Sequence, residues 1–325
     1  MIVSTNPVIT PGGTLSNSPV EDEMSQRLDV RGKIFYLLTG AACLIIVLMV
    51  AFIIGNIFLN GKDHLSWRFI TAAPEEGMTA GGIFPAIYGT LLLVILMTLA
   101  VVPVGVMVAI YLHEYSAHTS LLYKTTRLAV SNLAGVPSIV FGLFGLGFFV
   151  KFVGGNIDRL FYGGSLVFGQ PAIIWAALTL AVLTMPVVIL TTEDTLRAIP
   201  NELREASMAL GATKFQTIVH TVLPQAVTGI MTGGILAVSR GAGEVAPILF
   251  TGAAYFLPEL PKKLTSQFME LGYHIFVLST QSPDVEKTKP ILYSTVFVLL
   301  ALTFLLNLVA IIIRSQMRAR LRRRA

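Results

Sequence analysis

Six long apolar stretches constrain this chain more than any other feature of its sequence. They cover about 34–59, 84–112, 129–152, 172–192, 226–251 and 290–313. A helix needs roughly 20 apolar residues to cross the hydrocarbon core of a bilayer, and each stretch reaches that length. Backbone polar groups in lipid must be bonded internally, and runs this long favour helices over strands. The sequence predicts an all-α membrane protein with six transmembrane helices.

The charge content agrees with this class. Charged residues make up 13% of the 325 positions, about half of the roughly 25% typical of soluble domains. The net charge is +5, but residues 314–325 hold six arginines and no acid, so the rest of the chain is near −1. This basic tail is typical of a segment beside anionic lipid, and we expect no binding to nucleic acid. A single cysteine, Cys43, excludes a disulfide framework.

Lysine and arginine placement predicts the orientation. We expect residues 1–33 to form a disordered cytoplasmic leader and 34–59 the first span. With both termini in the cytoplasm, the inner segments hold Arg27, Arg31, Lys33, Lys124, Arg127, Arg197, Arg204, Lys214 and the six tail arginines. The outer segments hold Lys62, Arg68, Lys151, Arg159, Lys262, Lys263, Lys287 and Lys289. This bias places the loop 193–224 inside and the loop 252–289 outside.

The cytoplasmic loop 193–224 has the pattern of two short helices joined by a tight turn. Pro200 opens the first helix, and Gly211 stands where a helix end favours a positive φ. Thr213 and Gln216 have the spacing of a capping box for a second helix, which we expect Pro224 to stop. A polar hairpin between two spans is placed to dock with a soluble partner. The physics alone leaves an ordinary solvated loop equally open.

The amino-acid sequence of this loop resembles that of a known family. Glu205-Ala206, Gly211 six residues later, Ile218 and Leu223-Pro224 resemble the EAA loop of ABC-transporter permeases. The resemblance implies a MetI-like importer bundle over 84–313, in which this loop couples to a cytoplasmic ATPase. The coupling residues that it implies are Glu205, Ala206, Ala209, Gly211, Ala212 and Thr213.

The fifth apolar stretch contains two charges. Arg240 and Glu244 are four residues apart, so on a continuous helix they share a face and can pair. A charge at the bilayer centre costs about 2.5–3.5 kcal/mol, which argues against a lipid-facing position. A neutralised pair packed inside the bundle is the simpler interpretation. The glycines nearby and the helix-breaking Pro247 favour a polar site on a solute path instead.

A second resemblance indicates which solute is carried. The stretch Ser239-Arg240-Gly241-Ala242-Gly243-Glu244-Val245-Ala246-Pro247, followed by Leu249-Phe250-Thr251, resembles the PstA family of phosphate permease subunits. The segment 132–143 is also similar to these permeases. The resemblance implies a pathway lined by Arg240, Glu244, Ser239, Gly241 and Gly243. It implies a bacterial inner-membrane complex with a PstC-like permease, a PstB-like ATPase dimer and a phosphate-binding protein.

Nothing in the sequence predicts an enzyme. There is no G-x-x-x-x-G-K-[ST] motif, so we expect ATP and Mg²⁺ to bind on the partner ATPase and no cofactor on this chain. No Ser/His/Asp cluster suggests a catalytic residue. The five histidines lack the spacing of a helical metal site, so we expect no metal.

Several alternatives stay open at this point. The substrate could be sulfate or molybdate, because one arginine does not distinguish tetrahedral oxyanions. The chain could be the PstC-type partner, an ion-coupled secondary transporter or a scaffold subunit without a solute path. In the outer loop 252–289, the spacing of Leu264, Phe268, Leu271 and Ile275 predicts a short amphipathic helix, which either covers the bundle or meets the binding protein.

Overall fold

The computed structural model describes residues 19–117, 119–282 and 284–322. These residues divide into two compact units, one up to Asn56 and one from Ile57 onward. Six helices in the described part of the chain are long and apolar enough to cross a membrane. They span Gly32–His64, Phe84–Tyr115, Ser138–Phe161, Ile173–Arg197, Lys214–Gly241 and Val285–Ala319. The prediction of an all-α protein with six transmembrane helices is confirmed.

The first unit is built on the helix α1, Pro19–Gly61. The prediction of a disordered leader up to residue 33 is wrong from Pro19 onward, and residues 1–18 lie outside the described part. Proline is favoured in the first turn of a helix, which is where Pro19 stands. No second proline follows before the apolar stretch, so the helix continues into it.

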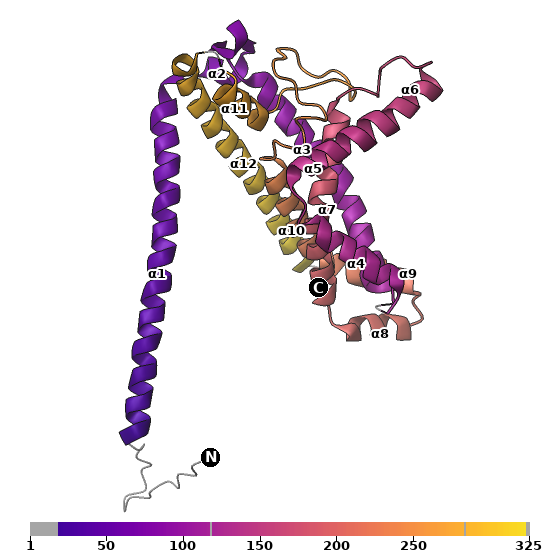
Figure 1. Cartoon of the computed structure of the whole chain (residues 1–325). Coiled ribbons are helices and arrows are strands. Elements are labelled where there is room, and N and C mark those ends of the chain that lie inside the picture. The colour runs from indigo at the N-terminus through magenta and orange to yellow at the C-terminus, as the bar shows by residue number, and fades with distance from the viewer. Residues whose placement is uncertain (1–18, 118, 283, 323–325) are drawn as a thin grey trace, which may run out of the picture. The chain divides into compact units, whose positions relative to one another are not determined.

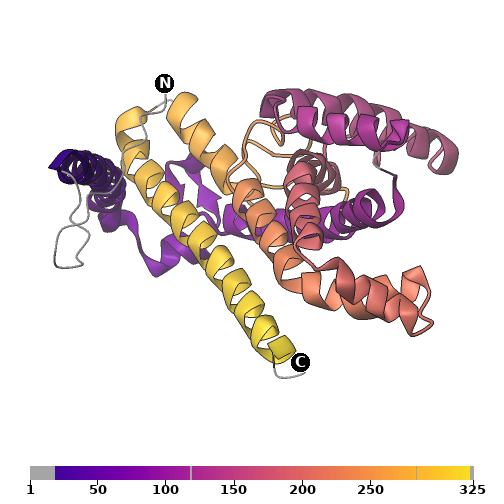
Figure 2. The same ribbon diagram turned by 90° about the horizontal axis from the view of Figure 1, so that it is seen from below.

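Three helices form the core of the second unit: α3 (Phe84–Ile110), α7 (Ile173–Arg197) and α10 (Leu223–Gly241). Their buried side chains form one cluster that includes Leu93, Met97, Leu180, Val188 and Ala237. α7 is the most buried of the spans and lies among its neighbours in both views (Figures 1 and 2). Its many alanines and threonines suit this central position, since small residues let helices approach closely.

Close approach is clearest between α7 and α10. A Cβ atom on Gly229 would overlap the side chain of Thr195, and one on Gly233 would overlap that of Thr191. Both pairs are four residues apart on their helices, so the contacts recur one turn apart along the interface. The glycines of α10 therefore serve helix packing here.

The third span departs from the prediction of one helix over 129–152. An amphipathic helix, α4 (Leu121–Leu133), is followed by a break and then by α5 (Ser138–Phe144), the π-helical segment η4 (Gly145–Gly154) and α6 (Gly155–Phe161). Pro137 causes the break, because proline disfavours helical geometry in the residue before it. Pro137 itself caps α5 with φ −57° and ψ 138°.

The fifth span differs at both ends. Pro224 does not stop the preceding helix as predicted: α9 (Lys214–Thr217), the π-helical turn η5 (Ile218–Val222) and α10 run on continuously. Pro224 lies in the first turn of α10, next to the wider π turn, where a missing N–H is tolerated. At the other end α10 stops at Gly241 instead of 251, and turns occupy most of 242–252.

The remaining elements lie at the two ends of the bundle. One end carries η1 (Lys62–His64), α2 (Trp67–Thr71), η2 (Glu76–Met78) between strands β1 (Pro74–Glu75) and β2 (Ala80–Gly81), and α11 (Leu271–Thr280). The two strands are antiparallel, with Pro74 opposite Gly81. The other end carries α4, α9 and α8 (Asn201–Ala209), with the π-helical η3 (Tyr111–Tyr115) extending α3 (Figure 1).

The short amphipathic helix predicted near 264–275 is only partly correct. α11 begins only at Leu271. The preceding residues are irregular, because the backbone of Phe268 bonds to another segment: its O accepts from Ala254 N–H at 2.8 Å, and its N–H donates to Gly252 O at 3.4 Å. The last helix, α12 (Val285–Arg322), packs along α10 and α11 (Figure 2). Ser294 Oγ donates to Gly61 O at 2.6 Å, which fixes its first half beside the end of α1.

Candidate functional site

The hairpin α8–α9 has the local structure that its sequence predicts. Gly211 has φ 87°, a conformation that favours glycine. The Gly211 N–H donates to Met208 O at 2.9 Å and the Ala212 N–H to Ser207 O at 3.3 Å, which is the Schellman pattern of a helix end. Thr213 and Gln216 then form a reciprocal capping box that starts α9. Both turn predictions are confirmed.

The outer face of this hairpin is open. Five of the six predicted coupling residues are exposed: Glu205, Ala206, Ala209, Gly211 and Thr213; Ala212 is partly buried. Beside them, Leu210 is 90% exposed and Phe215 66%. Large apolar side chains this exposed at a helix turn are typical of a surface that meets another protein.

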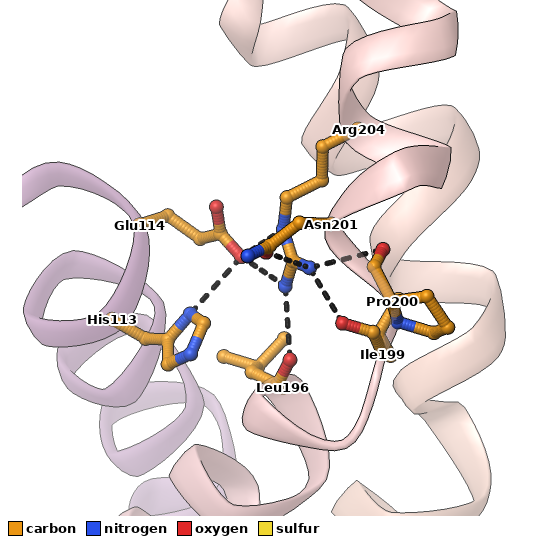
Figure 3. Close-up of polar contacts among 7 residues, drawn as sticks. All are labelled: His113, Glu114, Leu196, Ile199, Pro200, Asn201 and Arg204. Carbon is orange, nitrogen blue, oxygen red and sulfur yellow. Dashed lines mark hydrogen bonds and ion pairs between the residues drawn. The ribbon is translucent and has the colours of Figure 1, made fainter.

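The inner face of the hairpin is fixed to the bundle by Arg204 (Figure 3). Its Nε and Nη2 donate to Glu114 Oε1 at 3.1 and 2.8 Å. Its Nη2 also donates to Leu196 O at 2.9 Å, and its Nη1 donates to Ile199 O at 2.8 Å. Arg204 therefore pairs with η3 and also satisfies carbonyls at the end of α7, where a cation is favoured by the helix dipole.

The Arg204–Glu114 pair is shielded from solvent. The Arg204 side chain is 11% exposed and that of Glu114 7%. His113 Nδ1 lies 3.2 Å from the same carboxylate oxygen, and an ionised carboxylate only accepts, so this nitrogen carries the proton. We call Arg204, Glu114 and His113 the clamp.

A second contact joins η3 to the other half of the hairpin. Lys214 Nζ of α9 lies 5.1 Å from the ring centre of Tyr115. The two helices of the hairpin are joined to each other by Ser207 Oγ and Thr217 Oγ1, 3.0 Å apart. Both α8 and α9 therefore contact η3, which connects the hairpin to α3 as well as along the chain to α7 and α10.

The charged pair at the end of α10 has a different geometry from the one expected. Arg240 belongs to the last turn of α10, and Glu244 follows the helix end, so they do not share one continuous helix face. They still pair, with Arg240 Nε 3.5 Å from Glu244 Oε1, and their side chains are 37% and 20% exposed. The broken helix suggested by Pro247 is present, because turns replace the helix after Gly241.

The other predicted pathway residues separate into two groups. Ser239 is exposed, and its Oγ accepts from Asn307 Nδ2 of α12 at 3.3 Å. Gly243 is exposed with open space around it. Gly241 is buried, and a Cβ on it would overlap the side chain of Met97. In this structure Gly241 therefore serves the packing of α10 against α3 rather than an open surface.

The hairpin and the charged break both lie within a region that matches a known family. The family described as "Binding-protein-dependent transport system inner membrane component" matches residues 101–323. The chain belongs to this family of ABC importer permeases. The permease is thus a multi-pass protein of the inner membrane.

Individual relatives of this chain are also named as permeases. The chain is 32% identical over 267 residues to the probable ABC transporter permease protein YqgI of Bacillus subtilis, covering 77% of this chain and 85% of that protein. It is 35% identical over 223 residues to the phosphate transport system permease protein PstA of Yersinia pestis, covering 68% and 70%. PstA 1 of Mycobacterium tuberculosis (strain CDC 1551 / Oshkosh) is 42% identical over 176 residues, and this match spans only about half of each chain, 54% and 52%.

Solved structures support the fold of the permease. A bacterial alginate ABC transporter, solved with its pentasaccharide-bound periplasmic protein, has a TM-score of 0.61 at 15% identity and covers 91% of this chain and 96% of that chain. The inward-facing MetNI methionine ABC transporter has a TM-score of 0.50 at 19% identity, covering 73% and 94%. At these identities the likeness shows the fold alone, which is the MetI-like bundle expected from the sequence.

Sequence reasoning missed the clamp. Arg204 contributed to the sequence-based prediction only as one of the inner positive charges, and Glu114 was not part of that prediction. One signal was available: Glu114 is an acid at the inner end of an apolar span, where basic residues are the rule. Its partner lies 90 positions away, so only the tertiary structure of the permease reveals the pair.

Proposed function

We propose that this permease is one transmembrane subunit of an ATP-driven importer for inorganic phosphate. The observation that carries its role in energy coupling is the clamped hairpin, which is exposed on one face and fixed to α3 and α7 on the other. The choice of phosphate is supported by the relatives named PstA, at 30–42% identity.

In this proposal both termini and the hairpin α8–α9 lie on the cytoplasmic side. The inner segments then carry the larger number of lysines and arginines. The end of the bundle with α2 and α11 faces outward, toward the phosphate-binding protein. A PstC-like permease completes the pathway, and a PstB-like ATPase dimer binds ATP and Mg²⁺ beneath the two hairpins.

ATP-driven closure of the ATPases acts on the exposed residues of α8 and its turn. The clamp and the Lys214–Tyr115 contact transmit this movement to η3 and α3, while the continuous helix from α9 transmits it to α10. The two ends of the pathway thereby open in alternation.

Arg240 acts as a transient cation for the passing anion. Its 3.5 Å ion pair with Glu244 is loose, and both side chains are partly accessible. Glu244 tempers the attraction, because a pathway must bind its solute weakly enough to release it.

The first test is uptake of radiolabelled phosphate in cells that lack their own high-affinity system. The cells carry this permease with its operon neighbours, as wild type, Arg240→Gln or Gly211→Asp. Arg159→Gln is a matched control, because Arg159 is exposed on α6, away from α2, α11 and the hairpin (Figure 1). Membrane insertion is checked for each variant.

We expect wild type and Arg159→Gln to import phosphate, Arg240→Gln to lose uptake with the ATPase still bound, and Gly211→Asp to lose the ATPase. Uptake of sulfate or molybdate without phosphate would overturn the substrate and leave the coupling role standing. Full uptake with a bound ATPase in Gly211→Asp would overturn the coupling role.

Orientation has its own test. The test uses a variant with Cys43 replaced by alanine and single cysteines at Phe215 or Leu264, which are both exposed. Phe215 lies on α9 of the hairpin, and the Leu264 O accepts from Ile174 N–H at the start of α7, the end of that helix away from the hairpin. A membrane-impermeant thiol reagent applied to intact cells should label Leu264→Cys and spare Phe215→Cys until the cells are opened. The reverse pattern would overturn the proposed orientation.

A further inference from the structure

An apolar groove lies between α3 and α12, with α10 as its floor. α10 packs against both helices, which leaves a cavity of about 240 Å³ between them. Its lining residues come from all three helices: Val94, Ile95, Thr98, Leu99, Val238, Leu306, Val309, Ala310 and Ile313.

The groove offers almost no polar group to an occupant. Its only polar side chain, Thr98, donates its hydroxyl to Val94 O of its own helix at 2.7 Å. The rims are open, since Ile95 is 52% exposed, Leu99 67% and Ile313 49%. The occupant must therefore be apolar along this length.

The groove ends beside two arginines. Arg314 follows Ile313 on α12, and its Nη1 donates to Thr232 Oγ1 of α10 at 3.0 Å, which fixes the guanidinium near the groove. Arg318 lies one turn further along α12 and is exposed. α12 runs down to the end of the bundle that carries α8 and α9 (Figure 1). In a membrane, an apolar groove below a pair of cations complements one acyl chain below an anionic headgroup.

We propose that this groove is a binding site for an anionic phospholipid of the inner leaflet. One acyl chain lies against Ala310 and its neighbours, and the headgroup phosphate pairs with Arg314 and Arg318. A volume of about 240 Å³ suits a hydrocarbon chain, whereas a packed helix is roughly 10 Å wide. Cytoplasmic leaflets carry the anionic lipid that basic residues attract. The site is independent of which solute the permease carries.

The test uses the complete purified transporter and native mass spectrometry. Binding of phosphatidylglycerol is compared with that of phosphatidylcholine, which has the same acyl chains and no net charge. Ala310→Phe fills the groove, and Arg318→Gln removes an exposed charge. Ala301→Phe on another exposed part of α12 and Lys124→Gln on α4 are the matched controls.

We expect wild type to retain phosphatidylglycerol in preference to phosphatidylcholine. Ala310→Phe should lose the bound lipid, and Arg318→Gln should bind it about fivefold more weakly, as removal of one basic residue at an anionic surface implies. Both controls should bind as wild type does.

Three results would overturn the proposal. The first is equal binding of the two lipids by wild type, and the second is undiminished binding by both Ala310→Phe and Arg318→Gln. The third is an Ala310→Phe chain that inserts and binds lipid normally but no longer assembles with the partner permease, which would make the groove a protein interface. If Ala310→Phe fails to fold, Arg318→Gln decides, because its side chain is exposed.

Discussion

Arg204 Nη2 lies 2.8 Å from Glu114 Oε1, which joins the hairpin α8–α9 to the end of α3 across 90 positions of sequence. The two partners are unequal. Arg204 also donates to carbonyls at the end of α7, whereas Glu114 has beside it only His113 among the described residues.

This inequality predicts different costs for the two neutral substitutions. Arg204→Gln leaves a buried carboxylate and unbonded carbonyls, and we expect it to destabilise the permease by about 3 kcal/mol. Glu114→Gln keeps an oxygen acceptor for the guanidinium and should cost clearly less. Thermal unfolding of the purified complex, with ATPase retention as a second readout, measures both. Equal losses would contradict the predicted inequality, and independent effects in the double variant would contradict a direct pair.

Gly211 should tolerate asparagine better than alanine. Its φ of 87° strains most side chains, although no atom lies within 4 Å of a Cβ built there. Alanine in the left-handed region costs about 1–2 kcal/mol, whereas asparagine adopts it more readily. We expect Gly211→Ala to weaken co-purification of the ATPase more than Gly211→Asn. Gly243→Ala is the control, since it also has open space but no positive φ.

Gly241→Ala should destabilise through contact with Met97. An added Cβ would overlap Met97 Sδ and lie 2.8 Å from its Cε, and overpacking of this kind costs about 1–3 kcal/mol. Met97→Val ends at the γ position and makes room, so the double variant should be more stable than the sum of the single effects. Thermal unfolding measures this coupling. A simple sum would mean that Met97 moves aside without cost.

Two buried groups, Glu270 just before α11 and His274 within it, should have opposite effects on how stability depends on pH. Burial raises the pKa of Glu270 to about 7 from 4.5, against the lowering effect of the Gly272 and Tyr273 N–H groups. Burial lowers the pKa of His274 to about 4 from 6.5. Between pH 4.5 and 7 the folded state holds the Glu270 proton more tightly, so stability falls as pH rises. Between pH 4 and 6.5 the unfolded state holds the His274 proton more tightly, so stability rises with pH.

The two effects should nearly cancel from pH 4.5 to 6.5. Glu270→Gln leaves the histidine contribution, so its stability relative to wild type should increase over this range by about 1 kcal/mol per pH unit. His274→Phe should show the opposite slope. Unfolding midpoints at half-unit pH intervals measure these differences, and parallel curves for all three proteins would exclude titration of either group in this window.

The sequence by itself determined the class, the number of spans and the local turns. Long apolar runs leave only helices in a bilayer, and the Gly211 turn and the Thr213–Gln216 capping box are local structures whose residues lie within a few positions of each other. Such signals do not depend on the rest of the fold. The same is true of the Pro137 break, which the sequence contained and which the prediction of one span over 129–152 overlooked.

Only the tertiary structure decided which partner each polar or small residue has. Pro224 is tolerated because a π turn precedes it, and Gly241 is small because Met97 of α3 lies against it. The clamp and the groove depend on helices far apart in sequence, whose approach is set by packing around α7. Apolar helices can pack in many ways with similar burial, so hydrophobic pattern alone does not choose among them, whereas specific close contacts and the Arg204–Glu114 pair do.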